Sequence, residues 1–296
     1  MTEVERKFGW IGPSKPDMRN KIFPSLQPSI DATTQVDISG GDTPVYNQNG
    51  FGACTGFAMK SAFEYWQKFK LGKFSDESAM FIYKKARDLL KLHGDSGATL
   101  KAVTMAVNKY GVCPSAIWPY TAKNLNKEPS VTAVMNAKKN EATAYYNIDV
   151  PGKPLGQVFT DCLGAFDVAK LPFIAGVPVY SSYVQGEKTG WFPYPIKGEN
   201  IVGGHALEYA GWFPNLVITN ESDGSTTTGA FKFKNSWDTT WGDKGYGYLP
   251  RKYLDMGLLT DLWVVTNETH LAKLLGMRTM GQAMDATVLI ENNTET

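Results

Sequence analysis

The chain of 296 residues holds three cysteines and three histidines, the residue types that could supply a nucleophile and its base. Cys54 follows a glycine-containing loop and opens a stretch with apolar residues at three- and four-residue spacing, which predicts a helix over 54–66. At a helix N-terminus the unpaired amides and the helix dipole favour a thiolate and lower the thiol pKa. We therefore interpret Cys54 as a candidate nucleophile.

The candidate base is His205, which follows two glycines that allow close backbone approach at the start of a strand pattern. His93 lies in a charged helix end and His270 on a short polar helix, and we expect both side chains to be solvated. Cys113 and Cys162 lie among apolar residues, so we expect buried, unreactive thiols.

Further motifs flank these two residues in a fixed order: Gln48, Gly52-Ala53-Cys54, Gly203-Gly204-His205-Ala206, Asn235-Ser236-Trp237, Trp241-Gly242 and Gly245-Tyr246-Gly247. Together they resemble the papain-like (C1 family) cysteine peptidases, and the resemblance runs from about residue 36 to 265. Thr55 and Phe51 stand where cathepsins usually carry Trp and Cys. The chain is therefore more similar to the bacterial and viral branch of that family.

The resemblance implies a mechanism in which the Cys54 thiolate attacks the scissile carbonyl and the His205 imidazolium protonates the leaving amine. Asn235 would orient the His205 ring, and Trp237 would cover the hydrogen bond between them. Gln48 and the backbone N–H of Cys54 would form the oxyanion hole. The implied activity is that of an endopeptidase, which acts on polypeptides and needs no metal or organic cofactor.

The resemblance also indicates where a substrate would bind. Gly97 resembles the family glycine whose backbone pairs with an extended substrate. Four small residues would leave a roomy apolar second subsite: Ala98, Gly176, Gly204 and Ala206. We expect this pocket to favour bulky apolar or aromatic side chains and, because no carboxylate is expected there, to disfavour basic ones.

Two other functions stay open. The same thioester chemistry serves other acyl-transfer enzymes, such as amidases and transpeptidases, and release of a free N-terminus from a peptide would separate them. A non-catalytic module in a larger assembly, such as a virion or a secretion system, is the second alternative. The presence of Gln48, Cys54, His205 and Asn235 together argues against the second alternative.

The elements that must position these residues change character along the chain. Apolar periodicity predicts further helices over 75–92, 100–110 and 268–275, and short β-rich runs predict strands over 171–180, 205–212, 231–234 and 246–250. Residues 215–229 are predicted as a polar hairpin tip. The fold class is α+β: a helical lobe over 36–126, an antiparallel β-barrel-like lobe over 127–265, and the active-site cleft between them.

Residues 1–35 hold four prolines and little periodicity, which predicts an extended arm. The arm is too short for a globular inhibitory prodomain, so we expect it to lie in or across the cleft and to keep a zymogen inactive until it is displaced or cut near its junction with the core. An arm that merely packs on the back of a lobe is the alternative. Residues 266–296 form a C-terminal extension.

Composition narrows the partners and the location. The chain is 43% hydrophobic with 30 Lys and Arg against 29 Asp and Glu, so it lacks the basic surface that nucleic acid or an anionic membrane would require. The charged N-terminus is unlike a secretory signal, and three cysteines make no disulfide framework. We therefore expect a cytoplasmic protein, with signal-independent export or virion association left open.

Overall fold

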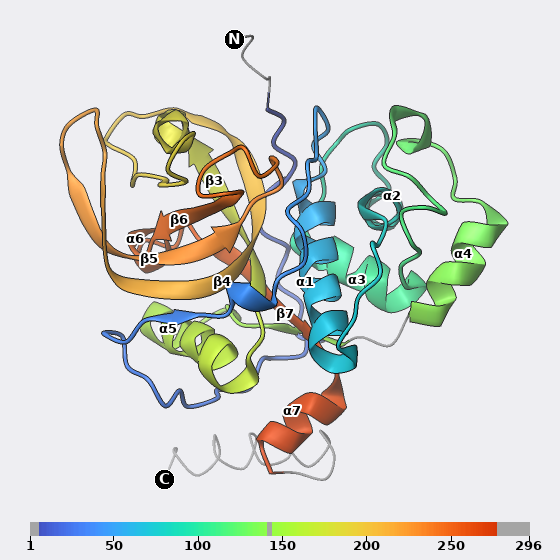
Figure 1. Cartoon of the computed structure of the whole chain (residues 1–296), viewed down its shortest axis with the longest axis horizontal. Helices are drawn as coiled ribbons and strands as arrows, with labels where there is room; N and C mark the ends of the chain where they lie inside the picture. Colours follow the sequence, from blue (N-terminus) through green and yellow to red (C-terminus); the bar gives the residue numbers. More distant parts are fainter. Residues whose placement is uncertain (1–5, 141–143, 277–296) are drawn as a thin grey trace.

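In the computed structural model, which describes residues 6–140 and 144–276, the helices of the first half lie together beside a β lobe (Figure 1). They are α1 (Cys54–Leu71), α2 (Ala79–Leu90), α3 (Leu100–Tyr110) and α4 (Val131–Ala137). The helix predicted over 100–110 is confirmed at both ends, and α1 runs beyond its predicted end to Leu71. The helix predicted from residue 75 begins later, because Ser78 caps it by accepting a hydrogen bond from the Phe81 amide.

The sheet of the β lobe is antiparallel and follows the order β2-β7-β3-β4-β5-β6. Its strands are β2 (Ala144–Asn147), β3 (Phe173–Tyr180), β4 (Ile201–Thr219), β5 (Thr226–Lys234), β6 (Tyr246–Pro250) and β7 (Thr260–Thr266), and the short β1 (Val36–Asp37) pairs with β4. The sheet is not closed on itself, so the barrel-like expectation was wrong in that respect. Strands β4 and β5 extend through most of the predicted hairpin tip because Val217 to Thr219 pair with threonines of β5.

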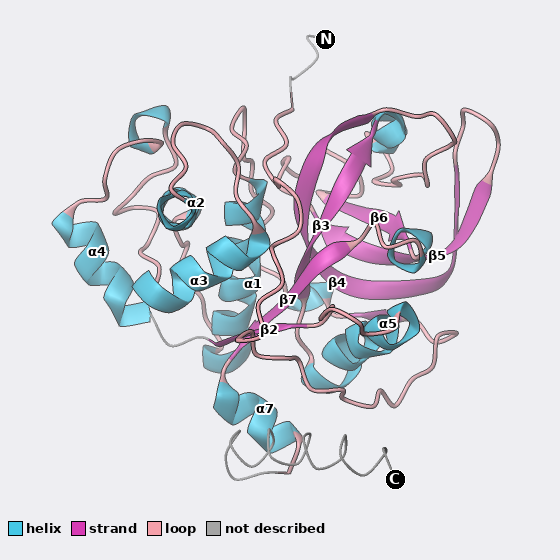
Figure 2. Cartoon of the chain, turned by 180° about the vertical axis from the view of Figure 1, so that it is seen from behind, coloured by secondary structure: helices cyan, strands magenta, loops and turns pink. Residues whose placement is uncertain are grey.

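Three elements were not predicted from the sequence: helix α5 (Leu155–Gly164) and the strands β2 and β7. Helix α5 covers the β lobe, and β2 pairs with β7 across the back of the molecule (Figure 2). Strand β7 is buried along nearly its whole length, so it lacks the apolar–polar alternation that marks a half-buried strand. Two short helices, α6 (Lys252–Asp255) and α7 (Glu268–Leu274), flank β7, and α7 agrees with the helix predicted at 268–275 to within one residue.

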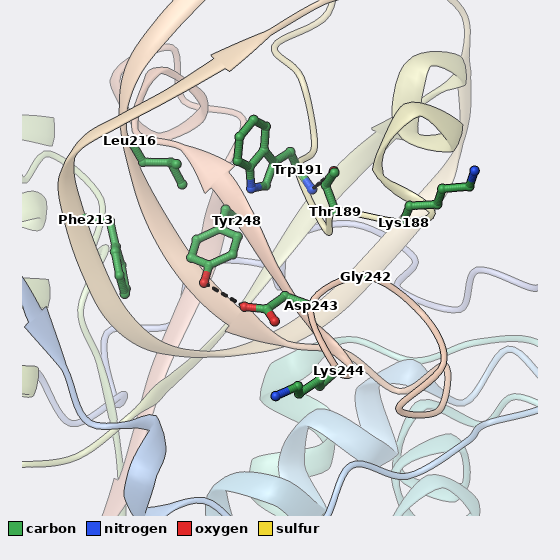
Figure 3. A pocket seen from close by; sticks show the side chains of 9 residues that line it. All are labelled: Lys188, Thr189, Trp191, Phe213, Leu216, Gly242, Asp243, Lys244 and Tyr248. Carbon is green, nitrogen blue, oxygen red and sulfur yellow. Dashed lines mark hydrogen bonds between the residues drawn. The ribbon is translucent and has the colours of Figure 1, made fainter.

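The β lobe carries an open hollow of about 550 Å³ on its outer surface (Figure 3). Aromatic rings of Trp191, Phe213 and Tyr248 line it, and the Tyr248 hydroxyl donates to the Asp243 carboxylate at 3.1 Å. None of the site residues predicted from the sequence lines this hollow.

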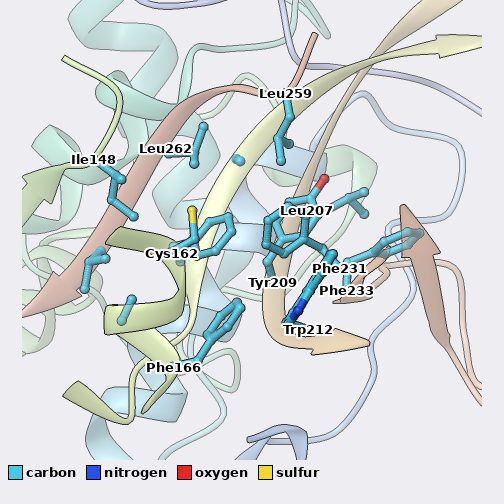
Figure 4. Packing of buried hydrophobic residues seen from close by; sticks show 14 of the residues in the cluster. Ile148, Cys162, Phe166, Leu207, Tyr209, Trp212, Phe231, Phe233, Leu259 and Leu262 are labelled. Carbon is cyan, nitrogen blue, oxygen red and sulfur yellow. The ribbon is translucent and has the colours of Figure 1, made fainter. Parts of the chain in front are cut away.

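Two hydrophobic clusters fix the lobes. In the β lobe, Phe173 stacks between Phe166 and Tyr209 with ring centroids 5.3 and 5.1 Å away. Figure 4 shows Phe166 and Tyr209 in this cluster. The second cluster joins the helices to Ala206 of β4 and contains Cys54 itself. Helix α1 therefore begins against the strand that carries His205.

The N-terminal arm is extended and runs between α1 and the β lobe before it turns under the molecule (Figure 1). Within the described part of the chain, none of the helices is long and apolar enough to cross a membrane.

Candidate active site

Cys54 is the first residue of α1, as the spacing predicted, and its side chain is fully buried. Burial raises the pKa of the thiol to about 11, although the backbone amides of Ala206, Gly9 and Trp10 act on the sulfur in the opposite direction. The expected lowering of the pKa is thus reversed in this structure. The reason is that residues 6–12 of the arm, called the plug below, cover the sulfur.

His205 lies on β4 with its Nε2 2.9 Å from Oδ1 of Asn235. The indole of Trp237 stacks on the imidazole at 4.7 Å between centroids and 14° between planes. The ring is fully buried, and its Nδ1 has no hydrogen-bond partner among the described residues. Burial lowers the pKa of His205 to about 4; the bond to Asn235 opposes this shift, and the positive charge of Arg6 adds to it.

Gln48 is buried and held from both sides. Its Oε1 accepts a 2.6 Å hydrogen bond from the Ser236 hydroxyl, which turns Nε2 in the opposite direction. That Nε2 donates to the backbone carbonyl oxygens of Phe51 at 2.8 Å and of Lys7 at 2.9 Å. A peptide carbonyl of the plug thus occupies the place where an oxyanion hole would act, and Ser236, which the sequence motif contained without a role, positions the amide.

The plug pairs with both lobes through its backbone. The Trp10 amide donates to the Gly204 carbonyl at 2.9 Å, and the Ala98 amide donates to the Gly9 carbonyl at 2.9 Å. The backbone that pairs with the plug is that of Ala98 and not that of Gly97. Gly97, at φ +75°, instead leaves room for the plug, because a Cβ there would lie 2.5 Å from the Gly9 carbonyl oxygen. Gly9 is itself tightly enclosed, since a Cβ on it would lie 1.7 Å from the Gly52 oxygen.

The indole of Trp10 fills the pocket predicted as the second subsite. A Cβ on Gly176 would lie 2.1 Å from the ring, and one on Gly204 would lie 2.2 Å from the Trp10 carbonyl oxygen. Ala206, opposite Gly176 in the β3–β4 pairing, belongs to the same cluster as Trp10. The small residues therefore make room for a large aromatic ring.

The expectation that the pocket holds no carboxylate was wrong. Asp261, at the start of β7, accepts hydrogen bonds from Nε1 of Trp10 at 3.4 Å and from Ser14 Oγ at 3.2 Å. It is also bonded to Trp263 Nε1 and the Leu100 amide, and burial raises the pKa of its carboxyl. Its φ of +62° lies in the left-handed region, next to a register shift in the β3–β7 pairing, which directs the side chain into the pocket.

At the other end of the plug, Phe8 packs edge-on against His205 at 5.8 Å and against Trp237 at 6.0 Å. The Arg6 guanidinium lies 4.2 Å from the centre of the Trp237 ring and pairs with Glu187. The plug therefore lies against Gln48, Cys54 and His205, three of the residues that the sequence assigned to catalysis.

The remaining thiols and imidazoles lie away from this site. Cys113 and Cys162 are buried, which confirms the expectation, and burial raises the pKa of both thiols, that of Cys113 to about 12. His93 is exposed as expected. His270 is not a solvated side chain, because it packs edge-on against Trp66 and its Nε2 lies 3.2 Å from a backbone carbonyl. Among the residues that the structure describes, His, Cys, Asp and Glu form no cluster that could hold a metal ion.

Comparison with known proteins relates this chain to one family. The sequence model that describes the papain family of cysteine proteases matches residues 43–264. An uncharacterized peptidase C1-like protein, L477, of Acanthamoeba polyphaga mimivirus is 28% identical over 290 residues, which cover 90% of this chain and 88% of the viral protein.

Among solved structures, xylellain, a cysteine protease from Xylella fastidiosa, is similar with a TM-score of 0.70 and 25% identity over 90% of this chain and 99% of xylellain. Digestive procathepsin L 3 of the Tenebrio molitor larval midgut is similar in fold, with a TM-score of 0.60 and 16% identity over 89% of this chain and 76% of that one. The matched family region includes Gln48, Cys54, His205 and Asn235.

Proposed function

Because this chain belongs to the papain family of cysteine proteases, and is a peptidase by that membership, we propose that it is an endopeptidase with Cys54 as the nucleophile and His205 as its base. Asn235 holds the imidazole by the 2.9 Å hydrogen bond, and the stacked Trp237 keeps water from that bond. These contacts fix the orientation of the ring before any substrate arrives.

In the open enzyme a substrate replaces the plug. The Cys54 thiolate attacks the carbonyl carbon, and its negative oxygen accepts hydrogen bonds from Gln48 Nε2 and from the Cys54 backbone amide. His205 then protonates the leaving amine, and water, deprotonated by the same imidazole, hydrolyses the thioester. The contact that best supports this assignment is the 2.9 Å hydrogen bond from Gln48 Nε2 to the Lys7 carbonyl oxygen, in which this amide donates to a peptide carbonyl as an oxyanion-hole donor must.

The plug makes the described chain a zymogen in this proposal. It buries the thiol and the imidazole, and their shifted pKa values keep both groups neutral near pH 7, where a thiolate–imidazolium pair is needed. Two features support inhibition rather than incidental packing: the backbone pairing with Ala98 and Gly204, and the filling of the second subsite by Trp10. That similar proteases are known as proforms is consistent with this role.

The second subsite, with Asp261 at its end, defines the substrate class. It accepts a bulky side chain two positions before the cut, and the carboxylate favours side chains that carry an N–H donor, as Trp10 does. Arginine and lysine meet the same requirement, so basic side chains join the bulky apolar and aromatic ones in the predicted preference.

The test uses the full chain with a Gly9→Ala substitution, because the added methyl group cannot fit against Gly52 and so opens the plug. This variant should hydrolyse a fluorogenic peptide, release a free N-terminus, and react with an epoxide thiol inhibitor at Cys54 alone. The double variant with Cys54→Ser should be inactive but folded, and Cys113→Ser serves as the matched control for loss of a thiol. Transfer of the acyl group to an amine without hydrolysis would favour a transpeptidase, and absence of both labelling and turnover would favour a non-catalytic module.

A further inference from the structure

The plug begins with two basic residues, and each pairs with a carboxylate of a different lobe. Arg6 pairs with Glu187 of the β lobe at 2.5 Å. Lys7 pairs with Asp95 of the helical lobe at 3.5 Å. Resting on the proposed peptidase function, we propose that these carboxylates form a subsite for basic residues that follow the cut, in which Glu187 selects an arginine side chain.

The plug shows on which side of the nucleophile this subsite lies. The Trp10 indole fills the second subsite, which receives the side chain two positions before the cut. From Trp10 the extended plug passes the Cys54 sulfur, on which the Gly9 amide acts, and reaches Arg6 on the other side. A substrate that fills the second subsite therefore carries the residues after the cut past the groups that surround Arg6.

Two contacts of the plug limit the position that this subsite serves. Counted back along the plug from Trp10 in the second subsite, Arg6 corresponds to the third residue after the cut. Counted from the Lys7 carbonyl, which accepts the hydrogen bond from Gln48 Nε2, Arg6 corresponds to the second. An arginine side chain bridges this difference, because it is longer than one step of about 3.3 Å along an extended chain. The proposal therefore concerns the second and third residues after the cut.

The surface under the Arg6 guanidinium belongs to the β lobe and does not depend on the plug. The guanidinium carbon lies 4.2 Å from the centre of the Trp237 ring. That ring is held by Trp241, which packs edge-on at 5.2 Å, and by Phe192 at 6.4 Å. The face of an indole attracts a cation, and a planar guanidinium stacks on it better than an ammonium group does. The ring is thus ready for an arginine side chain when the plug leaves.

Glu187 supplies the charge of the subsite, and its backbone is fixed to the same lobe. Its carbonyl accepts a 2.9 Å hydrogen bond from the Gly242 amide, and its own amide donates to the Val184 carbonyl at 3.2 Å. The neighbouring Lys188 does not share this position, because it lines the outer hollow (Figure 3). The carboxylate therefore stays beside Trp237 without the plug and can accept a charge-assisted hydrogen bond from a substrate guanidinium.

Asp95 adds negative charge on the opposite lobe. Its carboxylate accepts hydrogen bonds from the Gly52 amide and the Tyr83 hydroxyl, both at 3.0 Å, so it also stays in place without the plug. The Lys7 side chain that it pairs with is 52% exposed, against 16% for the Arg6 side chain. Since solvent screens the more exposed pair more strongly, Glu187 is the main determinant of the preference.

The experiment uses internally quenched peptides, because a fluorogenic leaving group carries no residues after the cut. All peptides have leucine two positions before the cut, and they carry arginine, citrulline, leucine or glutamate at the first, second or third position after it. Citrulline has the shape of arginine without its charge. The enzyme is the full chain with Gly9→Ala, and Trp10→Ala provides a second opened background. Because the open fraction multiplies the rates of all peptides equally, ratios of kcat/KM report on the subsite and not on the plug.

At the second or third position, arginine should raise kcat/KM over citrulline by about 3- to 30-fold, as a half-exposed ion pair and a cation–π contact together predict. Glu187→Gln should lower this ratio by about 2- to 5-fold, the share of the ion pair. Glu187→Lys should invert the preference, so that the glutamate peptide is cleaved faster than the arginine peptide. Asp255→Asn is the matched control, because Asp255 is 44% exposed, against 41% for Glu187, and also pairs with an arginine. It should leave all ratios unchanged.

Three results would overturn the proposal: equal rates for arginine and citrulline at both positions, an arginine preference that Glu187→Gln leaves unchanged, or an arginine preference that persists in Glu187→Lys. The first is the result expected if the pair of Arg6 and Glu187 only fastens the plug. In all three cases the peptides are cleaved, so the proposed function stands and the subsite alone is wrong. If neither opened chain cleaves any peptide or labels at Cys54, the proposed function is wrong and the subsite with it.

Discussion

The contribution of Trp10 to inhibition gives the most quantitative prediction. Its indole is 7% exposed, is enclosed at Gly176, and donates to the buried Asp261 carboxylate. Replacing a buried tryptophan by alanine destabilises the state in which the ring is buried by about 3–5 kcal/mol. Since each 1.36 kcal/mol is a factor of ten, Trp10→Ala should raise the opening constant of the plug by about 10²–10⁴. Because the open fraction cannot exceed one, kcat/KM rises by this full factor only if few wild-type molecules are already open.

The assay is hydrolysis of a short fluorogenic peptide by the full-length variant, together with the rate at which an epoxide inhibitor labels Cys54. Both rates should rise by similar factors, and the lobes should still unfold cooperatively, because the rest of the second cluster stays packed without Trp10. Met18→Ala, in the same arm but 98% exposed, is the matched control and should leave both rates unchanged. A folded Trp10→Ala protein with wild-type kcat/KM and wild-type labelling would refute the assignment of the plug as the inhibitory element.

Three further predictions concern the site itself, each measured in an opened background except the last. Ser236→Ala removes the hydroxyl that holds the Gln48 side chain. A hydrogen bond of about 0.5–1.5 kcal/mol predicts a loss of roughly 2- to 13-fold in kcat with little change in unfolding temperature. An unchanged kcat would contradict the positioning role of Ser236. Asp261→Asn should lower kcat/KM by about 10- to 100-fold for peptides with arginine two positions before the cut and leave leucine peptides unaffected, so equal losses for both would remove the carboxylate from substrate selection. Because burial lowers the pKa of His205 from 6.5 to about 4 in the closed form, the open form binds more protons, and acidification from pH 7 toward 4 should open the plug. Hydrogen exchange at the Trp10 amide, corrected for its intrinsic rate, should lose protection over that range, and constant protection would show that the closed form does not depend on a neutral imidazole.

The proposed catalytic residues could be predicted from the sequence because their signals are local. A cysteine at a helix start, a histidine after two glycines, and the Asn235-Ser236-Trp237 motif each depend on neighbouring residues, and the helix start at Cys54 is confirmed. The pattern of α1 predicted one buried face, whereas every residue from Cys54 to Trp66 is buried, because α1 packs against both β4 and α2. The fold class was therefore predictable, whereas the pairing of β2 with β7 and the open sheet required the structure.

Asp261 and the shifted pKa values were beyond sequence reasoning for a different reason. A lone aspartate before an apolar run is typical of a strand start, and nothing local indicates the left-handed backbone that turns it into the pocket. The pKa of Cys54 depends on chain segments that are distant in sequence, because the plug and β4 together exclude water from the sulfur. The dipole argument at the helix start is sound for an open site, but in the closed form desolvation is the larger effect.

The direction in which the plug lies in the site explains how a peptide can occupy the site of a peptidase without serving as its substrate. A substrate presents its scissile carbonyl on the residue that follows the side chain in the second subsite. In the plug that side chain is Trp10, yet the carbonyl that accepts a hydrogen bond from Gln48 belongs to Lys7, three residues before Trp10. The plug therefore runs through the site in the chain direction opposite to the one that the proposed mechanism requires of a substrate, and Trp10 lies parallel to Ala98. This reversed direction, together with the neutral thiol, keeps the arm intact in its own active site.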